Sequence, residues 1–410
     1  MKLYRIGRED LSSVAGFMTL GLMMGQMGPL LSAASVDLGI DAQEIGTTIS
    51  VFFGVSIIGI LMGLFWIRPL GKERFLLLAS ALLGVAYAGG LAIRSPLGLT
   101  GITVLTGLGL GMYQIGINSL AVDRTSSWKE ADQAGRIAFL QFFFGVGAVL
   151  APLLVDLSHL HLHNWRLSYG MVLLLGPVAV AVGMLRDLRQ QRIGSGAVSD
   201  SVEETFERPL RHPIRWKLPL LMVLCVAAIY TALETSMFNW LSFYWDRRFE
   251  GVSWITGARA SAVFWLIFSL SRAGMGVVVA QLGAWRSLLS FALLMGLMFA
   301  IWVGFSPGPW GLLPIVVGIA LLMGCMFPTI LVLISRQQPG ESSQIIGVLF
   351  VLITASATVA PMGIGQVCKR FDISMYPWTL LGIAALLIVG LLSARELRRR
   401  AKSRLRQEES

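Results

Sequence analysis

Long apolar stretches recur along the whole 410-residue chain and are separated by short polar segments. About 20 apolar residues in a helix are enough to cross the hydrocarbon core of a bilayer. The chain is 55% hydrophobic and 14% charged, whereas a soluble domain carries about 25% charged residues. This composition predicts an all-α membrane protein with twelve transmembrane helices. The expected helices cover residues 11–36, 43–67, 75–93, 97–122, 137–157, 167–185, 218–245, 256–280, 287–305, 312–334, 345–367 and 376–392.

Positive charge is distributed unevenly between the two sides of the expected membrane. Of the 33 Lys and Arg residues, 25 fall in the tails and in the loops on the same side as the tails, and 7 fall in the opposite loops. Because cytoplasmic loops carry the excess of Lys and Arg, both termini are expected in the cytoplasm. The sequence therefore predicts a multi-pass protein of the plasma membrane, which in a bacterium is the inner membrane.

Charge pattern and cysteine content argue against several other functions. The net charge of +10 does not indicate nucleic-acid binding, because the basic residues lie between apolar segments and in the tails, without interleaved aromatic residues. Three scattered cysteines form neither a disulfide framework nor a metal cluster. Trp66 stands where a phosphate-binding loop before Gly71 and Lys72 would need its first Gly. We expect no enzymatic activity, no cofactor and no metal.

One long hydrophilic segment, residues 186–217, divides the chain into two halves. Its Gly, Ser and mixed charges are typical of a flexible linker, here on the cytoplasmic side. An Ala-Pro pair at residues 151–152, in the fifth expected helix, recurs at residues 360–361 in the eleventh. This correspondence favours two parallel six-helix repeats. The expected domains are a six-helix bundle over residues 1–185, the linker, a second six-helix bundle over residues 218–392, and a basic cytoplasmic tail over residues 393–410.

This layout resembles that of the major facilitator superfamily of transporters over essentially the whole chain. In that superfamily the loop between the second and third helices usually reads Gly-x-x-x-Asp-Arg-x-Gly-Arg-Arg. Gly63, Gly71 and the basic residues Arg68 and Arg74 fit this pattern, while Ile67 stands at the Asp position. The resemblance implies that Arg68 and Arg74 are gating residues, without the usual Asp as their partner.

Three segments are similar to the fucose/galactose/glucose–proton symporter family. Residues 107–118 form a glycine-rich fourth helix that ends in Asn. Residues 230–234 resemble the Tyr-x-Gly-x-Glu motif of the seventh helix, followed downstream by Asn239 and Trp240. Residues 264–272 resemble Phe-Trp-Leu-Gly-x-x-x-Gly-Arg in the eighth helix. The resemblance implies proton-coupled transport of a sugar.

The chain departs from that family at two acidic positions. Gln114 stands where family members commonly have a carboxylate, and the first helix offers Gln26 where the fucose-type members have another acid. Glu234 is thereby left as the main titratable candidate. Drug antiporters carry an Arg early in the fourth helix, where this chain has Thr103, which argues against a typical drug exporter.

Glu234 lies within an expected membrane helix that contains no basic residue. A carboxylate at that depth costs about 2.5–3.5 kcal/mol on insertion scales, so it is expected to face a cavity, a partner or a proton path. We interpret Glu234 as the proton-coupling residue. The alternative is a structural ion pair with Arg272, the one basic residue within the expected membrane core, which we otherwise assign to a gate.

Polar and aromatic side chains within the expected helices form the candidate binding set. Amides both donate and accept hydrogen bonds, which suits the hydroxyls of a sugar. Small residues at Gly107, Gly109 and Gly111 let a neighbouring helix approach closely. The amides would alternatively hold helices together, and Trp240 would belong to the aromatic belt at the membrane surface. The expected substrate-contacting residues are Gln26, Gln114, Asn118, Gln141, Tyr230, Asn239, Trp240 and Trp265.

These features together predict a secondary transporter that moves a small polar solute, such as a sugar, by alternating access, with a proton carried by Glu234. Two alternatives remain open: a proton-coupled exporter of a metabolite or drug, and an uncoupled uniporter. The expected partners are a small-molecule substrate, a proton and the lipid bilayer. No nucleic acid is expected to bind, and the protein is expected to be a monomer.

Overall fold

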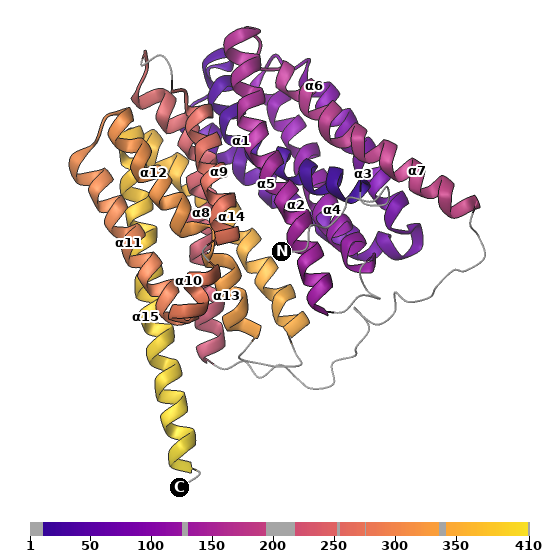
Figure 1. Ribbon diagram of the computed structural model, residues 1–410. Coiled ribbons are helices and arrows are strands. Elements are labelled where there is room, and N and C mark those ends of the chain that lie inside the picture. Colours follow the sequence, from indigo (N-terminus) through magenta and orange to yellow (C-terminus); the bar gives the residue numbers. More distant parts are fainter. Residues whose placement is uncertain are drawn as a thin grey trace. The chain divides into compact units, whose positions relative to one another are not determined.

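The computed structural model describes residues 11–124, 130–193, 218–251, 255–274, 276–335 and 342–408. Helices form the regular elements of these ranges (Figure 1). Eleven of them are long and apolar enough to cross a membrane. The chain folds into two compact units. Unit 1 comprises residues 1–39 and 51–213, and unit 2 comprises residues 40–50 and 214–410.

Unit 1 is formed by the helices coloured indigo to magenta in Figure 1. Two five-residue π-helical segments, η2 and η3, interrupt the α-helices of its second half. Its elements are α1 (Leu11–Leu38), α2 (Ala42–Leu70), α3 (Lys72–Gly90), α4 (Pro96–Asp123), α5 (Glu130–Asp156), η2 (Leu157–His161), α6 (Leu167–Leu173), η3 (Leu174–Val178) and α7 (Ala179–Ile193).

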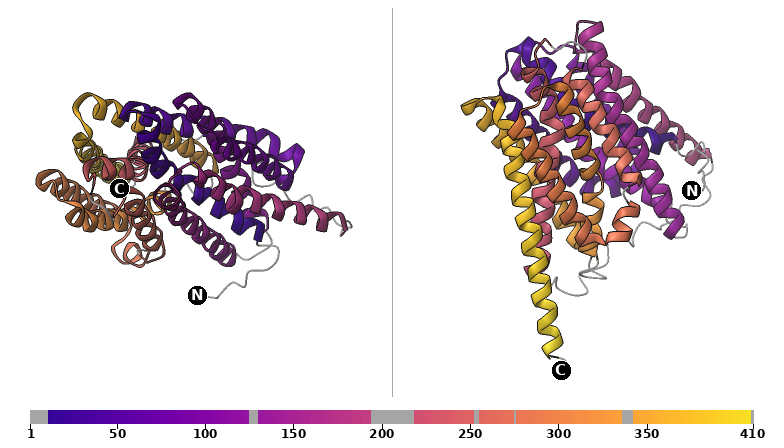
Figure 2. Two further views of the ribbon diagram at one scale, coloured as in Figure 1. Left: turned by 90° about the horizontal axis from the view of Figure 1, so that it is seen from above. Right: turned by 60° about the vertical axis from the view of Figure 1, so that its left-hand side comes forward.

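Unit 2 holds the remaining helices together with the beginning of α2. Its last helix, α15, runs on past the other helices of the unit (Figure 2). The elements are α8 (Leu218–Arg248), α9 (Gly257–Gly274), α10 (Gly276–Leu282), α11 (Ala284–Phe305), α12 (Pro309–Met323), α13 (Met326–Ser335), α14 (Ser342–Phe371), the 3-10 turn η4 (Ile373–Met375) and α15 (Tyr376–Glu408).

Most of the expected helices are present, with several differences in extent and continuity. The sixth runs on to Ile193, into the expected linker, whose remaining residues 194–217 lie outside the described ranges. The sixth is divided by η3, which contains Pro177, and the tenth is divided into α12 and α13 at Gly324. The last continues to Glu408, well beyond its expected end at residue 392. The eighth corresponds to α9 and α10 and is not among the eleven apolar spans, because α9 carries Arg259, Arg272 and several serines.

Helix α1 is the most enclosed helix of unit 1, because 83% of the residues in its apolar stretch are buried. Glycines let it lie directly against α5. A methyl group at Gly21 or Gly25 would overlap the carbonyl groups of Phe144 and Ala148, and one at Gly147 would overlap the backbone of α1 in the same way. Small residues at such contacts allow the close backbone packing that holds membrane helices together.

The glycines of α4 serve two different neighbours. Methyl groups at Gly107 and Gly111 would overlap the carbonyl oxygens of Phe52 and Ser56 in α2, whereas one at Gly109 would overlap Leu83 in α3. The prediction that these three glycines permit close helix approach is therefore confirmed. Gly101, on the same helix, is exposed, and a methyl group added there would have no atom within 4 Å.

Ion pairs tie the helix ends of unit 1 together. Arg124, after α4, binds Asp187 of α7 at 2.6 Å and the hydroxyl of Ser12 in α1 at 2.8 Å. Arg166, before α6, binds Asp37 at the end of α1 at 2.6 Å. Such charge-assisted hydrogen bonds are about twice as strong as neutral ones. Both ends of α1 are thus anchored to later helices.

The beginning of α2 forms a capping box within unit 2. The Asp41 carboxylate accepts from the Glu44 backbone N–H, and the Glu44 carboxylate accepts from the Asp41 backbone N–H, both at 2.9 Å. Asp41 also pairs with Lys369 at the end of α14, at 2.9 Å. Gly46 and Gly365 bring the two backbones together, since a methyl group at either would meet the other helix.

Gly111→Ala is expected to lower the stability of the protein by about 1–3 kcal/mol, because the added methyl group has no room beside Ser56. Gly101→Ala is the matched control on the same helix, and it should instead gain about 0.5–1 kcal/mol of helix propensity. Thermal unfolding of the detergent-solubilised protein, followed by tryptophan fluorescence, measures both. Equal effects of the two variants would contradict the close packing of α4 on α2.

The ion pair of Asp41 with Lys369 is expected to stabilise the protein only above acidic pH. Partial burial acts to raise the pKa of Asp41, but the hydrogen bonds from the Glu44 backbone and from Lys369 outweigh it and lower that pKa. A carboxylate with a lowered pKa contributes stability above its ordinary pKa of about 3.9, and this contribution is lost as the pH falls through the lowered value.

Lys369→Met should therefore lower the unfolding temperature at neutral pH, by the equivalent of at most about 1 kcal/mol for an exposed pair. The difference from the unchanged protein should vanish as the pH falls through the lowered pKa of Asp41. Arg370→Met removes a neighbouring cation outside this ion pair and serves as the control. A difference that persists unchanged into strong acid would show that Asp41 is not involved.

Candidate functional site

Glu234 and Tyr230 lie one turn apart on α8 and so share a face of that helix. The Tyr230 hydroxyl oxygen lies 3.0 Å from Oε1 of Glu234 and 2.8 Å from the backbone carbonyl oxygen of Met323, at the end of α12. Tyr230 is fully buried, and the Glu234 side chain is 14% exposed. The acid is therefore enclosed within unit 2.

Arg272 of α9 is the cation that faces this acid. Its Nη2 lies 4.0 Å from the same Oε1 of Glu234, and its guanidinium lies 4.5 Å from the centre of the Phe268 ring. A direct charged hydrogen bond would be about 2.7–2.9 Å long. The two residues are brought together, which was the alternative for Glu234, but as a loose pair rather than a bonded one. The proton-coupling role of Glu234 and the gating role of Arg272 stay predictions.

The break between α12 and α13 lies beside this group. Pro328 in the first turn of α13 has no N–H to return to the Gly324 carbonyl, and its ring disfavours a continuous helix there. Gly324 leaves room for α9, because a methyl group would overlap the Phe268 carbonyl. The Ser271 hydroxyl donates to the Leu321 carbonyl at 2.5 Å, which ties α9 to α12.

Two buried polar atoms lie just beyond Glu234 on α8. Asn239 is 1% exposed and donates to the Thr235 carbonyl at 2.9 Å, yet its Oδ1 has no hydrogen-bond partner among the residues that the structure describes. Nε1 of the adjacent, fully buried Trp240 also lacks one within those ranges. One acceptor and one donor thus stay unmatched within the described part of the chain.

The aromatic candidates are packed against other rings. The centre of the Trp240 ring lies 6.4 Å from that of Tyr376, and the centre of the Trp265 ring lies 4.9 Å from that of Phe238. Both tryptophans are buried. Their roles in substrate binding stay predictions, and a solute would reach the ring faces only after these contacts rearrange.

The amide candidates of unit 1 divide into two groups. Gln114 and Asn118 are half-buried on one face of α4, where the Asn118 amide donates to the Gln114 backbone carbonyl at 2.7 Å. The Gln26 amide instead donates to the Ser168 hydroxyl of α6 at 3.2 Å. Gln26 therefore makes the helix–helix hydrogen bond that was the alternative for it, and its contact with substrate stays a prediction.

The other candidates of unit 1 lie on its outside. Gln141, Arg68 and Arg74 are exposed. Lys72, the first residue of α3, forms an ion pair with Asp123 at the end of α4. Sequence reasoning missed this pair because it followed the family motif, although a cation and an acid at neighbouring helix ends were visible in the sequence.

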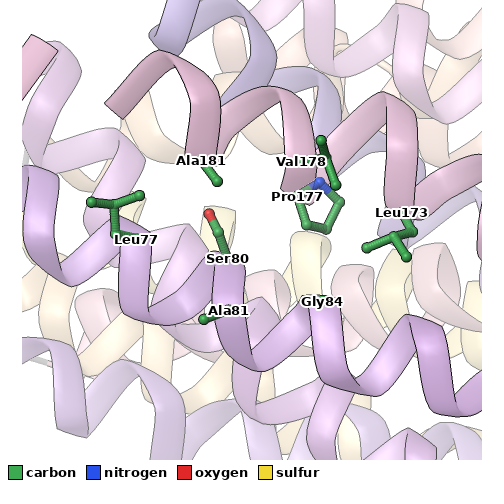
Figure 3. Close-up of a pocket in the computed structure, with 8 residues that line it drawn as sticks. All are labelled: Leu77, Ser80, Ala81, Gly84, Leu173, Pro177, Val178 and Ala181. Carbon is green, nitrogen blue, oxygen red and sulfur yellow. The ribbon is translucent and has the colours of Figure 1, made fainter. Parts of the chain in front are cut away.

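A cavity of about 330 Å³ lies on unit 1 between α3 and the broken sixth span (Figure 3). The Ser80 hydroxyl is its polar group, and it is already bonded to the Leu76 carbonyl and to Tyr113. An apolar cavity of this kind does not suit a polar solute. The lining residues are Leu77, Ser80, Ala81, Gly84, Leu173, Pro177, Val178 and Ala181.

The family model of the Major Facilitator Superfamily matches residues 12–361. The chain belongs to the major facilitator superfamily. The expected fold, an all-α membrane protein with twelve helices in two six-helix repeats, is confirmed by this match and by solved structures of the same superfamily fold. A search of curated sequences returned no match.

Two solved transporters illustrate the likeness of this major facilitator protein to known structures. A mutant of the nucleoside transporter NupG has a TM-score of 0.73 at 14% identity, covering 95% of this chain and 100% of the other. The peptide transporter POT in complex with sulfate has a TM-score of 0.72 at 14% identity, covering 97% of this chain and 99% of the other. At such identities the likeness shows the fold alone.

Family and fold identify a multi-pass membrane transporter and not an enzyme. Within unit 2, Tyr230 and Glu234 of α8 meet Arg272 of α9. The backbone carbonyl of Met323 belongs to the same group. No side-chain motif points to a backbone acceptor, although Pro328 signals the helix break that frees it.

Asn239→Leu is expected to raise the stability of the substrate-free protein by about 1 kcal/mol, because it removes a buried acceptor that lacks a partner among the described residues. The same change should weaken substrate binding if that acceptor serves the solute. Thermal unfolding with and without a transported solute measures both effects. A lower unfolding temperature without solute, with solute stabilisation unchanged, would contradict this role for Asn239.

Proposed function

We propose that this major facilitator protein moves a small polar solute, with a sugar as the favoured class, and couples the movement to a proton carried by Glu234. The observation that carries the proposal is an acid enclosed within a membrane span beside a tyrosine hydroxyl and a loosely held arginine. Intramembrane acids are retained where they bind a proton or a substrate, because they are otherwise costly there.

The substrate class rests on neutral polar groups. Gln114 and Asn118 share one face of α4, and Asn239 and Trp240 leave one acceptor and one donor unmatched among the described residues. Hydroxyl groups both donate and accept, so a polyol or sugar can satisfy such atoms. The similarity of residues 107–118 and 230–234 to the fucose/galactose/glucose symporter motifs supports the same class.

The neighbours of similar fold are consistent with a polar solute but do not select one. One is named for nucleosides and the other for peptides. A nucleoside contains a sugar, which makes nucleosides a second group of compounds to include in a substrate screen. We also propose that the protein lies in the plasma membrane with both termini in the cytoplasm, because of the distribution of Lys and Arg.

Uptake of labelled sugars and nucleosides into proteoliposomes, with and without an acidic exterior, tests both parts of the proposal. The unchanged protein is expected to concentrate its solute only when the pH gradient is imposed. Glu234→Gln should abolish this accumulation and keep exchange at equal solute concentrations, since the amide cannot release a proton. Glu396→Gln makes the same chemical change at an exposed position on α15 and should have no effect.

Accumulation by Glu234→Gln at the level of the unchanged protein would refute the role of Glu234. Uptake that ignores the gradient in the unchanged protein would indicate an uncoupled uniporter. Resistance of cells to apolar toxins, in the absence of any sugar or nucleoside flux, would indicate an exporter instead.

A further inference from the structure

The hydroxyl group of Tyr230 has two oxygen neighbours and one proton. It lies 3.0 Å from Oε1 of Glu234 and 2.8 Å from the carbonyl oxygen of Met323. A phenol donates one hydrogen bond, and a backbone carbonyl can only accept. Each contact is a full, unshared hydrogen bond only if Glu234 is protonated and donates to Tyr230, while Tyr230 donates to Met323; otherwise the two oxygens share the one phenol proton.

We propose that Tyr230 acts as a one-proton switch that ties the protonation of Glu234 to the break between α12 and α13. The inference rests on the proposed function, in which Glu234 carries the transported proton. When Glu234 is protonated, the chain of donors runs from Glu234 through Tyr230 to Met323. When the Glu234 O–H bond breaks and its proton passes to water, the Tyr230 proton turns to the carboxylate and leaves the Met323 carbonyl.

The hydrogen bond that Tyr230 donates to ionised Glu234 is stronger than the one it donates to the Met323 carbonyl. A hydrogen bond to a carboxylate is about twice as strong as one between neutral groups, so the Tyr230 hydroxyl donates to ionised Glu234 instead of to the Met323 carbonyl. The carbonyl then loses a donor beside a backbone that Pro328 has already interrupted. A carbonyl without a partner in the membrane interior is unfavourable, so the break is expected to open.

Arg272 supports the same assignment. Its Nη2 lies 4.0 Å from the oxygen of Glu234 that also faces Tyr230, which is beyond the distance of a direct charged hydrogen bond. This loose spacing matches a neutral carboxyl group. Ionisation of Glu234 would draw Arg272 inward, and because Ser271 is bonded to the Leu321 carbonyl, a shift of α9 would be transmitted to α12.

The other titratable groups near α8 do not compete for this role. Cys325 lies at the break and its thiol donates to the Ser271 carbonyl at 3.2 Å, and Tyr376 bonds to the Ser236 carbonyl at 3.2 Å. The described part of α13 carries no titratable side chain. The remaining ones on α9, α14 and α15 lie toward the ends of those helices: Arg259, Cys368, Lys369, Arg370, Arg395, Glu396, Arg398, Arg399, Arg400, Lys402, Arg404, Arg406 and Glu408.

Cys325 provides a native probe of the break, since its side chain is buried there. The experiment uses the full-length protein in liposomes with Cys225→Ser and Cys368→Ser, so that Cys325 is the one thiol left. The rate of its alkylation by N-ethylmaleimide is measured over a series of pH values. Dividing by the rate for the unfolded chain at the same pH removes the effect of thiol ionisation.

The normalised rate is expected to rise about fivefold to tenfold from acidic to alkaline pH, the change that the loss of one hydrogen bond makes in an opening equilibrium. Glu234→Gln should stay slow at every pH, because the amide N–H donates to Tyr230 as the protonated acid does. Tyr230→Phe should be fast at every pH. Tyr376→Phe, which removes another buried hydroxyl bonded to a carbonyl, should keep the pH dependence of the unchanged protein.

A normalised rate that does not change with pH in the unchanged protein would overturn the switch. A pH dependence of the alkylation rate that persists in Glu234→Gln or in Tyr230→Phe would also overturn it. If Tyr230→Phe does not fold, the result for Glu234→Gln is sufficient. Transport separates the two proposals. If Glu234→Gln loses gradient-driven accumulation but its alkylation rate keeps the pH dependence of the unchanged protein, the switch alone is refuted. If Glu234→Gln retains the accumulation, the proton role itself is refuted.

Discussion

The hydrocarbon core of a bilayer supplies no hydrogen bonds, and the arrangement of polar groups in this protein follows from that constraint. Every buried donor or acceptor in a span must find a partner inside the protein or stay at a cost of about 1–3 kcal/mol. Unit 1 is held together by tight backbone packing at glycines and by ion pairs at its helix ends, such as Arg124 with Asp187. Unit 2 instead keeps Glu234 loosely paired and Asn239 incompletely bonded within the described ranges.

The difference in how completely polar groups are hydrogen-bonded in the two units indicates where a solute or proton would bind. A polar group whose needs are met, such as Gln26 on Ser168, stabilises the bundle and has little left to offer a solute. A polar group whose needs are unmet exchanges partners at low cost, which is what a transport cycle requires. The loosely held set on α8 and α9 therefore fits a working site better than the satisfied set on α1 and α6.

The fold was predictable from the sequence because twenty apolar residues in a row have few alternatives to a membrane helix. The glycines at 107, 109 and 111 likewise predicted close packing, although the sequence could not say that two of them face α2 and one faces α3. The α9 span was harder to recognise by hydropathy, since arginines and serines lower its apolar character. Two of those residues, Arg272 and Ser271, make the contacts of α9 with Glu234 and Leu321.

The candidate site was predictable only in part, for a reason that lies in the chemistry of amides and backbone carbonyls. An amide in a membrane helix serves a neighbouring helix as well as it serves a solute, so residue type alone could not separate Gln26 from Gln114. Glu234 and Arg272 stood out because charge in a membrane span has few uses. Their connection to α12 runs through the Met323 carbonyl, and any residue at that position would supply the same acceptor. What distinguishes this carbonyl is its place at the last residue of α12, directly before the break, so a helix break beside an intramembrane acid is the pattern that would have revealed it.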